Sequence, residues 1–236
     1  MDRFKRQNNS IIQRADIGIQ AYMSQVYGWM MVGLLLTAFV ALYAINNSNI
    51  TMYLATHSWI LIGLIIAEFA LVIGLSVLLP KLSAELATTM FMLYSALTGL
   101  TTSMVLIAYT GTSVASTFFI AAAMFGALSF YGYTIKYDLS SIGNFLFMAL
   151  IGLIIASLVN IWLKSSGLTF MITYVGVLIF SGLVAYDTQK LKDMGNQMDS
   201  CDQEGIRKYA ILGALTLYLD FINLFFIMLR ILGDRR

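Results

Sequence analysis

Three acidic residues, Glu68, Asp187 and Asp220, lie within or at the border of long apolar stretches of this sequence. An acidic side chain at the centre of a lipid bilayer costs on the order of 3 kcal/mol on insertion scales. Such a side chain therefore normally faces other helices or a water-filled cavity, where it serves ion or proton movement. If the apolar stretches cross a membrane, these three carboxyl groups are the candidate functional groups.

The last apolar stretch places Asp220 on a polar stripe. Steps of three and four residues, which follow one face of a helix, give Tyr209, Gly213, Thr216, Asp220, Asn223, Ile227 and Arg230. The remaining faces carry Leu, Ile and Phe, so we expect the stripe to face protein or water. Thr216 and Asn223 join Asp220 as candidates for an ion pathway. In the alternative interpretation, Asp220 is a hydrogen-bonded residue that only packs helices together.

Glu68 and Asp187 each allow two interpretations. The neighbours of Glu68 on its helix face are apolar, so it needs a partner from another helix. It then either lines an ion path or is a protonated, hydrogen-bonded glutamic acid. Asp187 closes its apolar stretch within Ala185-Tyr186-Asp187-Thr188-Gln189, and taken alone it also fits a solvated helix end.

The composition requires a membrane around these residues. Of the 236 residues, 59% are hydrophobic and only 11% are charged, which is too few polar side chains to cover a water-soluble surface. A helix needs about 20 apolar residues to cross the hydrocarbon. Seven stretches pass this test: 22–45, 59–79, 87–109, 113–134, 142–163, 168–187 and 209–232. We predict an all-α integral membrane protein with a polar N-terminus (1–21), a seven-helix membrane domain (22–232) and a short basic C-terminus (233–236).

The basic residues predict the orientation. Ten of the 14 Lys and Arg fall at the N-terminus and in the second, fourth and sixth connections, which favours a cytoplasmic N-terminus. Arg230, Arg235 and Arg236 would then lie on the outer side of the membrane. As an alternative, the last apolar segment enters the membrane and returns to the cytoplasm.

The basic residues are too few and scattered for a nucleic-acid partner. A single Cys201 and a single His57 predict no cofactor.

The segment from Leu215 to Phe225, together with Ala185 to Gln189, resembles the Bax inhibitor-one family, also called the transmembrane Bax inhibitor motif family. The resemblance covers the whole chain, and the stretch from Tyr22 to Thr37 is most similar to the bacterial inner-membrane branch. It implies a bundle in which a central C-terminal helix is wrapped by the other six, placed in the bacterial inner membrane.

The resemblance also implies a pH-sensitive Ca²⁺ leak channel in which two aspartates, matching Asp187 and Asp220, share a proton and gate the pore. Glu68 matches the acidic residue of the family's second span. Some members carry an arginine latch near the end of that span, and only Lys81 could replace it here.

The repulsion between like charges supports a joint role for Asp187 and Asp220. Two carboxyls within hydrogen-bonding reach do not both ionise cheaply, so they share one proton, and its loss should separate the helices and open the path. Ca²⁺ prefers several oxygen ligands, which makes Asp187 and Asp220 weak candidate contacts for it as the transported ion. At about 1.5 Å per residue, however, the two differ in depth by about 10 Å, so one helix must sit deeper or start in a vestibule.

Two other functions stay open. Residues 1–21 could bind a membrane protease complex, making the chain a modulator of membrane quality control, as some bacterial relatives are described. Two membrane aspartates could also activate water as base and acid in an intramembrane aspartyl protease. Asp220 lacks the Gly-x-Gly-Asp companion of that class, so we predict that the chain is not an enzyme.

Overall fold

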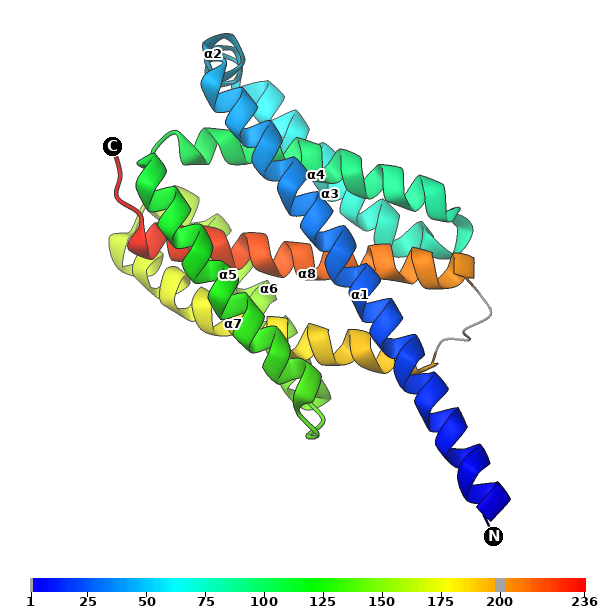
Figure 1. Cartoon of the computed structure of the whole chain (residues 1–236). Coiled ribbons are helices and arrows are strands. Elements are labelled where there is room, and N and C mark those ends of the chain that lie inside the picture. Colours follow the sequence, from blue (N-terminus) through cyan, green and yellow to red (C-terminus); the bar gives the residue numbers. More distant parts are fainter. Residues whose placement is uncertain (1, 198–202) are drawn as a thin grey trace. The chain divides into compact units, whose positions relative to one another are not determined.

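The computed structural model describes residues 2–197 and 203–236, with side chains from residue 18 onward. These residues form helices and contain no strand beyond one isolated bridge. The elements are α1 Asp2–Asn46, α2 Ser48–Thr56, α3 Ser58–Leu78, the 3-10 turn η1 Leu79–Lys81, α4 Ala84–Leu106, α5 Gly111–Thr134, α6 Ser140–Leu163, α7 Ser166–Gln197 and α8 Gln203–Leu232 (Figure 1).

The prediction of an all-α membrane protein with seven spans is confirmed. Within the described ranges, seven helices are long and apolar enough to cross a membrane, the first of them from Gly18 to Asn46. The polar segment 1–21 is not a separate element, because α1 begins at Asp2 and continues without a break into the first span. The short helix α2 was not predicted. It begins where the Asn47 side chain accepts a hydrogen bond from the Asn49 N–H, which is a common helix start.

The helices that carry the last two spans are longer than the apolar stretches of the sequence. The sixth span was expected to end at Asp187, and the seventh to begin at Tyr209. In the structure α7 continues to Gln197 and α8 already begins at Gln203. Residues 198–202, which include Cys201, lie outside the described part of the chain. Asp187 is therefore an interior residue of a 32-residue helix rather than a helix end.

The chain divides into two compact units, and the first comprises Met1–Val105 and Leu191–Thr216. Inside it, α1 and α4 approach closely at Gly99, where an added Cβ would lie 2.8 Å from the Thr37 carbonyl oxygen. Thr37 also donates a 2.8 Å hydrogen bond across these helices to the Ser95 carbonyl. Small and hydroxyl residues at helix contacts are typical of membrane bundles.

The second unit comprises Leu106–Lys190 and Leu217–Arg236. Its helices α5 and α7 touch at Gly132, whose missing side chain leaves room for the Ala185 carbonyl. The end of α8 packs on α5 through aromatic rings, with Phe221 edge-on to both Phe118 and Phe125. These contacts hold the two aspartate-bearing helices of this unit in place.

Burial differs strongly between the spans. In α8, 56% of the most apolar window is buried, the largest share of the seven spans, whereas α3 and α6 reach 6% each. A buried α8 is what a central C-terminal helix requires. The exposed side chains of α3 and α6 are mostly large and apolar, including Phe69 and Phe145, as expected of helices that face lipid.

The C-terminal residues close one end of the second unit. Arg235 forms an antiparallel bridge with Tyr109, and the Thr110 N–H donates to the Asp234 carbonyl at 3.0 Å. The C-terminus accordingly lies beside the connection between α4 and α5 (Figure 1). The last segment is one unbroken helix from Gln203 to Leu232, long and apolar enough to cross a membrane.

Candidate functional site

Asp187 and Asp220 meet inside the second unit. Asp187 lies on α7 and is half-buried, whereas Asp220 lies on α8 and is only 5% exposed. Their carboxyl groups lie within hydrogen-bonding reach of each other. The depth difference inferred from the sequence is wrong, because the two carboxyl groups meet although α7 continues to Gln197 and α8 begins at Gln203.

Asp220 is incompletely satisfied by the protein. Its Oδ2 is buried and has no hydrogen-bond partner among the described residues. The Lys190 ammonium is near enough to interact with Asp187 and lies 5.8 Å from the centre of the Tyr186 ring. The site thus combines a carboxyl pair, one cation and a free acceptor oxygen, and it can hold a proton or contact a cation.

The helix turn that carries Asp187 is fixed by its neighbours in sequence. The Thr188 hydroxyl bonds the Ser129 hydroxyl of α5 at 3.0 Å, and both side chains are buried. The Gln189 amide contacts the connection between α5 and α6: its Oε1 accepts from the Leu139 N–H and its Nε2 donates to the Tyr137 carbonyl, both at 2.8 Å. The sequence analysis did not identify Gln189, because a glutamine near a predicted helix end resembles a solvated residue.

Asp138 lies in the same connection, outside the spans. Its Oδ1 accepts a 2.8 Å hydrogen bond from the Ser140 N–H. Hydrogen bonds from the side chain and backbone of Ser140 lower the pKa of Asp138, since they favour the charged form.

Glu68 finds its partner within the first unit. The Thr101 hydroxyl of α4 donates a 2.9 Å hydrogen bond to Glu68 Oε1. Tyr94, on the same face of α4, lies near enough to interact electrostatically with the Glu68 carboxyl. Glu68 is half-buried, so one side of this intramembrane carboxyl is not covered by the chain.

The other predicted pathway residues make local contacts. The Thr216 hydroxyl donates to the Leu212 carbonyl at 3.1 Å, and the Asn223 amide donates to the Leu219 carbonyl at 2.8 Å. Both are half-buried, although Tyr209 and Arg230 of the same stripe are exposed. Lys81 is an exposed residue of η1 in the first unit, and its role as a latch stays a prediction.

Metal binding has limited support in the described ranges. Residues 18–197 and 203–236, whose side chains the structure describes, contain no group of three or more His, Cys, Asp and Glu that could hold a metal ion. Ca²⁺ usually takes six to eight oxygen ligands. Asp187 and Asp220 could therefore contact a passing hydrated cation, but they do not form a closed Ca²⁺ cage.

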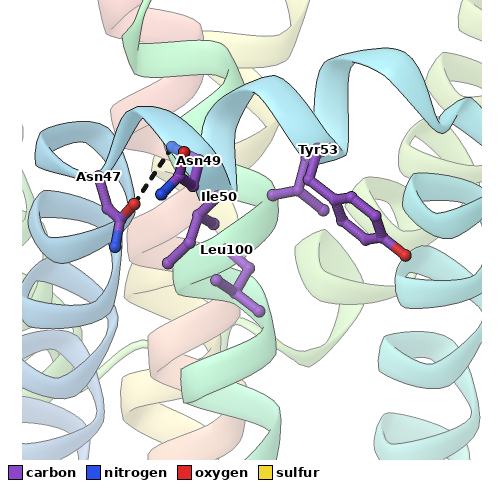
Figure 2. Close-up of a pocket in the computed structure, with 6 residues that line it drawn as sticks. Asn47, Asn49, Ile50, Tyr53 and Leu100 are labelled. Atoms are coloured by element: carbon purple, nitrogen blue, oxygen red, sulfur yellow. Dashed lines mark hydrogen bonds between the residues drawn. The ribbon is translucent and has the colours of Figure 1, made fainter.

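A surface pocket of about 390 Å³ lies in the first unit where α1 meets α2. Figure 2 shows its lining, in which the Asn47 side chain accepts a 3.2 Å hydrogen bond from the Asn49 N–H. The remaining lining residues are Ile50, Tyr53, Leu54 and Leu100. The pocket contains no carboxyl group and is separate from both acidic sites.

Comparison with known proteins identifies the family. The family model described as "Inhibitor of apoptosis-promoting Bax1" matches residues 19–236. The chain belongs to the Bax inhibitor-one family. Its Bax inhibitor relatives include "Inner membrane protein YbhL" of Escherichia coli (strain K12), 62% identical over the full length of both chains.

Other bacterial proteins are less similar but match over most of their length. An uncharacterized protein of Borreliella burgdorferi is 44% identical over 91% of this chain and 92% of its own. The uncharacterized protein YrjE of Lactococcus lactis is 38% identical over 96% of each chain. The resemblance noted in the sequence is thus confirmed for the family, and the matches span nearly the whole length of these relatives.

Proposed function

We propose that this Bax inhibitor-one family protein is a pH-sensitive cation leak pathway of the bacterial inner membrane, with a cytoplasmic N-terminus and Ca²⁺ as the transported ion. The observation that carries the proposal is the meeting of the Asp187 and Asp220 carboxyls, with a buried Asp220 oxygen that no described protein group satisfies. Acidic groups inside a membrane are energetically costly, and those that are present usually mark proton or ion pathways.

The pair acts as the gate. With one proton shared between the carboxyls, a hydrogen bond ties α7 to α8 and the path is closed. When the proton leaves, two negative charges at this distance repel each other, and a cation between them offsets the repulsion. Low pH therefore closes the path and higher pH opens it.

Residues outside the pair have proposed supporting roles. Glu68, Thr216 and Asn223 offer oxygen atoms to a cation along the path, and Lys81 takes the place of the family's arginine latch. A membrane protease complex stays a predicted partner of residues 1–21, most of whose side chains lie outside the described part. Truncating this segment and measuring protease association separately from ion flux tests that partner.

Flux through liposomes tests the main proposal. Purified protein is reconstituted with a Ca²⁺ indicator inside the vesicles, and uptake is measured from mildly acidic to alkaline pH. We expect wild-type flux to rise with pH, Asp187→Asn and Asp220→Asn to lose that response, and Asp138→Asn, an exposed aspartate of the same unit, to keep it. Wild-type protein that moves no Ca²⁺ at any pH would overturn the proposal, and peptide cleavage that depends on Asp220 would indicate a protease instead.

A further inference from the structure

One turn of α7 is fastened to three other parts of the second unit. The Tyr186 ring covers Gly143 of α6, where an added side chain would collide with it. Thr188 is hydrogen-bonded to Ser129 of α5. Gln189 spans the backbone of the α5–α6 connection through both ends of its amide. Asp187 is thus the member of this turn that faces α8, while its neighbours face α5 and α6.

The Gln189 side chain binds backbone groups of the segment just before α6. Leu139, the residue before Ser140, is buried and caps α6 with no side-chain hydrogen bond of its own, while Asp138 accepts from the Ser140 N–H. The first N–H groups of a helix have no partner within that helix, so Gln189 supplies a cap from a different one. A glutamine amide has both a donor and an acceptor, which lets a single side chain bind an N–H and a carbonyl together.

These bonds and the Asp187–Asp220 contact differ in kind. The Thr188, Gln189 and Tyr186 contacts join neutral groups, so they persist whether or not the carboxyl pair holds a proton. The charged groups around the turn within this unit are Lys190 and Asp220, with Lys136 and Asp138 exposed on the connection. The neutral contacts therefore hold Asp187 in one place, and the contact that changes lies towards α8.

We propose that Gln189 is a positioning residue that fixes Asp187 in a block formed by α5, α6 and the Tyr186 to Gln189 turn of α7. When the path opens, this turn of α7 stays packed against α5. The parts of the protein that move therefore lie outside the block. The role of this block in gating rests on the proposed function. Whether the block exists can be tested without measuring ion flux.

A reversible cross-link tests whether α7 leaves α5. The Ser129 and Thr188 side-chain oxygens are 3.0 Å apart, so cysteines at these positions can reach disulfide geometry with little adjustment. Ser129→Cys and Thr188→Cys are combined in a Cys201→Ser background, and flux is compared after oxidation and after reduction. We expect the two rates to agree within about twofold at every pH. A loss of about tenfold on oxidation that reduction restores would overturn the proposal.

Removing the amide tests Gln189 itself. Gln189→Met keeps the side-chain length but loses both hydrogen bonds, so Asp187 should be less well opposed to Asp220 and the flux ratio between alkaline and acidic pH should fall about threefold or more. Asn160→Leu is the matched control, since Asn160 bridges the α6–α7 turn at the other end of α7 through Ser165 and Thr169. An unchanged pH response in Gln189→Met, equal to that of Asn160→Leu, would contradict the positioning role.

Hydrogen–deuterium exchange separates this inference from the proposed function. In Gln189→Met, exchange should increase together in residues 135–143 and in the turn 185–190, and Asn160→Leu should affect neither. If wild-type protein carries no flux, the proposed function fails, and the exchange result alone decides whether the block exists. Faster exchange in the connection without any change in the turn would show that Gln189 caps α6 but does not position Asp187.

Discussion

The two acidic sites of this protein solve the same problem in different ways. Glu68 is half-buried on a lipid-facing helix and receives a hydroxyl hydrogen bond from Thr101. Asp220 is almost fully buried, meets another carboxyl and keeps one oxygen without a protein partner. The Thr101 donor favours the charged form of one carboxyl, whereas two carboxyls in contact are stabilised by a proton between them. In the proposed mechanism the pair, rather than Glu68, therefore responds to pH.

The largest expected effect concerns the pH response of Ca²⁺ flux, and it tests whether the losses caused by the two aspartate substitutions add. Either Asp187→Asn or Asp220→Asn destroys the pair, so the double variant should lose no more of the pH response of Ca²⁺ flux than each single variant, which we put at about tenfold or more. Glu68→Gln should lower flux at all pH values by a similar factor and leave the pH response intact. A double variant whose loss equals the product of the single losses would show that the two carboxyls act independently.

The packing around the sites offers a second distinction. Gly132→Ala places a methyl group against the Ala185 carbonyl beside the Asp187 turn, and overpacking of this kind costs about 1–3 kcal/mol. We expect a clear drop in thermal stability in detergent. Gly126→Ala on the same helix and Gly63→Ala on the helix of Glu68 have open space and are the controls. Equal melting temperatures for all three variants would contradict the close approach of α5 and α7.

Removing the hydrogen bond to Glu68 should have a smaller effect on stability. Thr101→Val keeps the side-chain shape but removes the donor, and a hydrogen bond of this kind contributes about 0.5–1.5 kcal/mol. We expect modest destabilisation in a denaturation series, with the same pH response of flux as wild-type protein. If Thr101→Val abolished the pH response, Glu68 would belong to the pH-sensing site.

The smallest effect concerns Asp138, outside the membrane spans. Because its pKa is lower in the folded protein than its usual value, its hydrogen bonds contribute stability above that value, and the contribution disappears as the pH falls through the folded-state pKa. Asp138→Asn should therefore lower stability slightly at neutral pH and match wild-type protein in strong acid. A difference that persisted in acid would show that the carboxylate charge is not responsible.

The seven spans could be predicted from the sequence, because the length of an apolar stretch reports a membrane-spanning helix directly. The ends of α7 and α8 could not, since helices continue beyond the hydrocarbon with polar residues such as Lys192 and Glu204, which resemble a loop in a hydropathy profile. The acidic candidates were identified from the cost of charge in lipid. Their partners Thr101 and Gln189 were not, because hydroxyl and amide groups are common and only the tertiary fold selects which ones meet.

The tail that pairs with the α4–α5 connection limits how the chain can be shortened. The Arg236 N–H bonds the Ala108 carbonyl at 3.0 Å, and the Asp234 N–H bonds Ser113 Oγ at 2.8 Å. Deleting residues 233–236 would leave these two acceptors without their donors, and a buried polar group without a partner is destabilising. The deletion should therefore loosen the start of α5, although it removes no residue of α8.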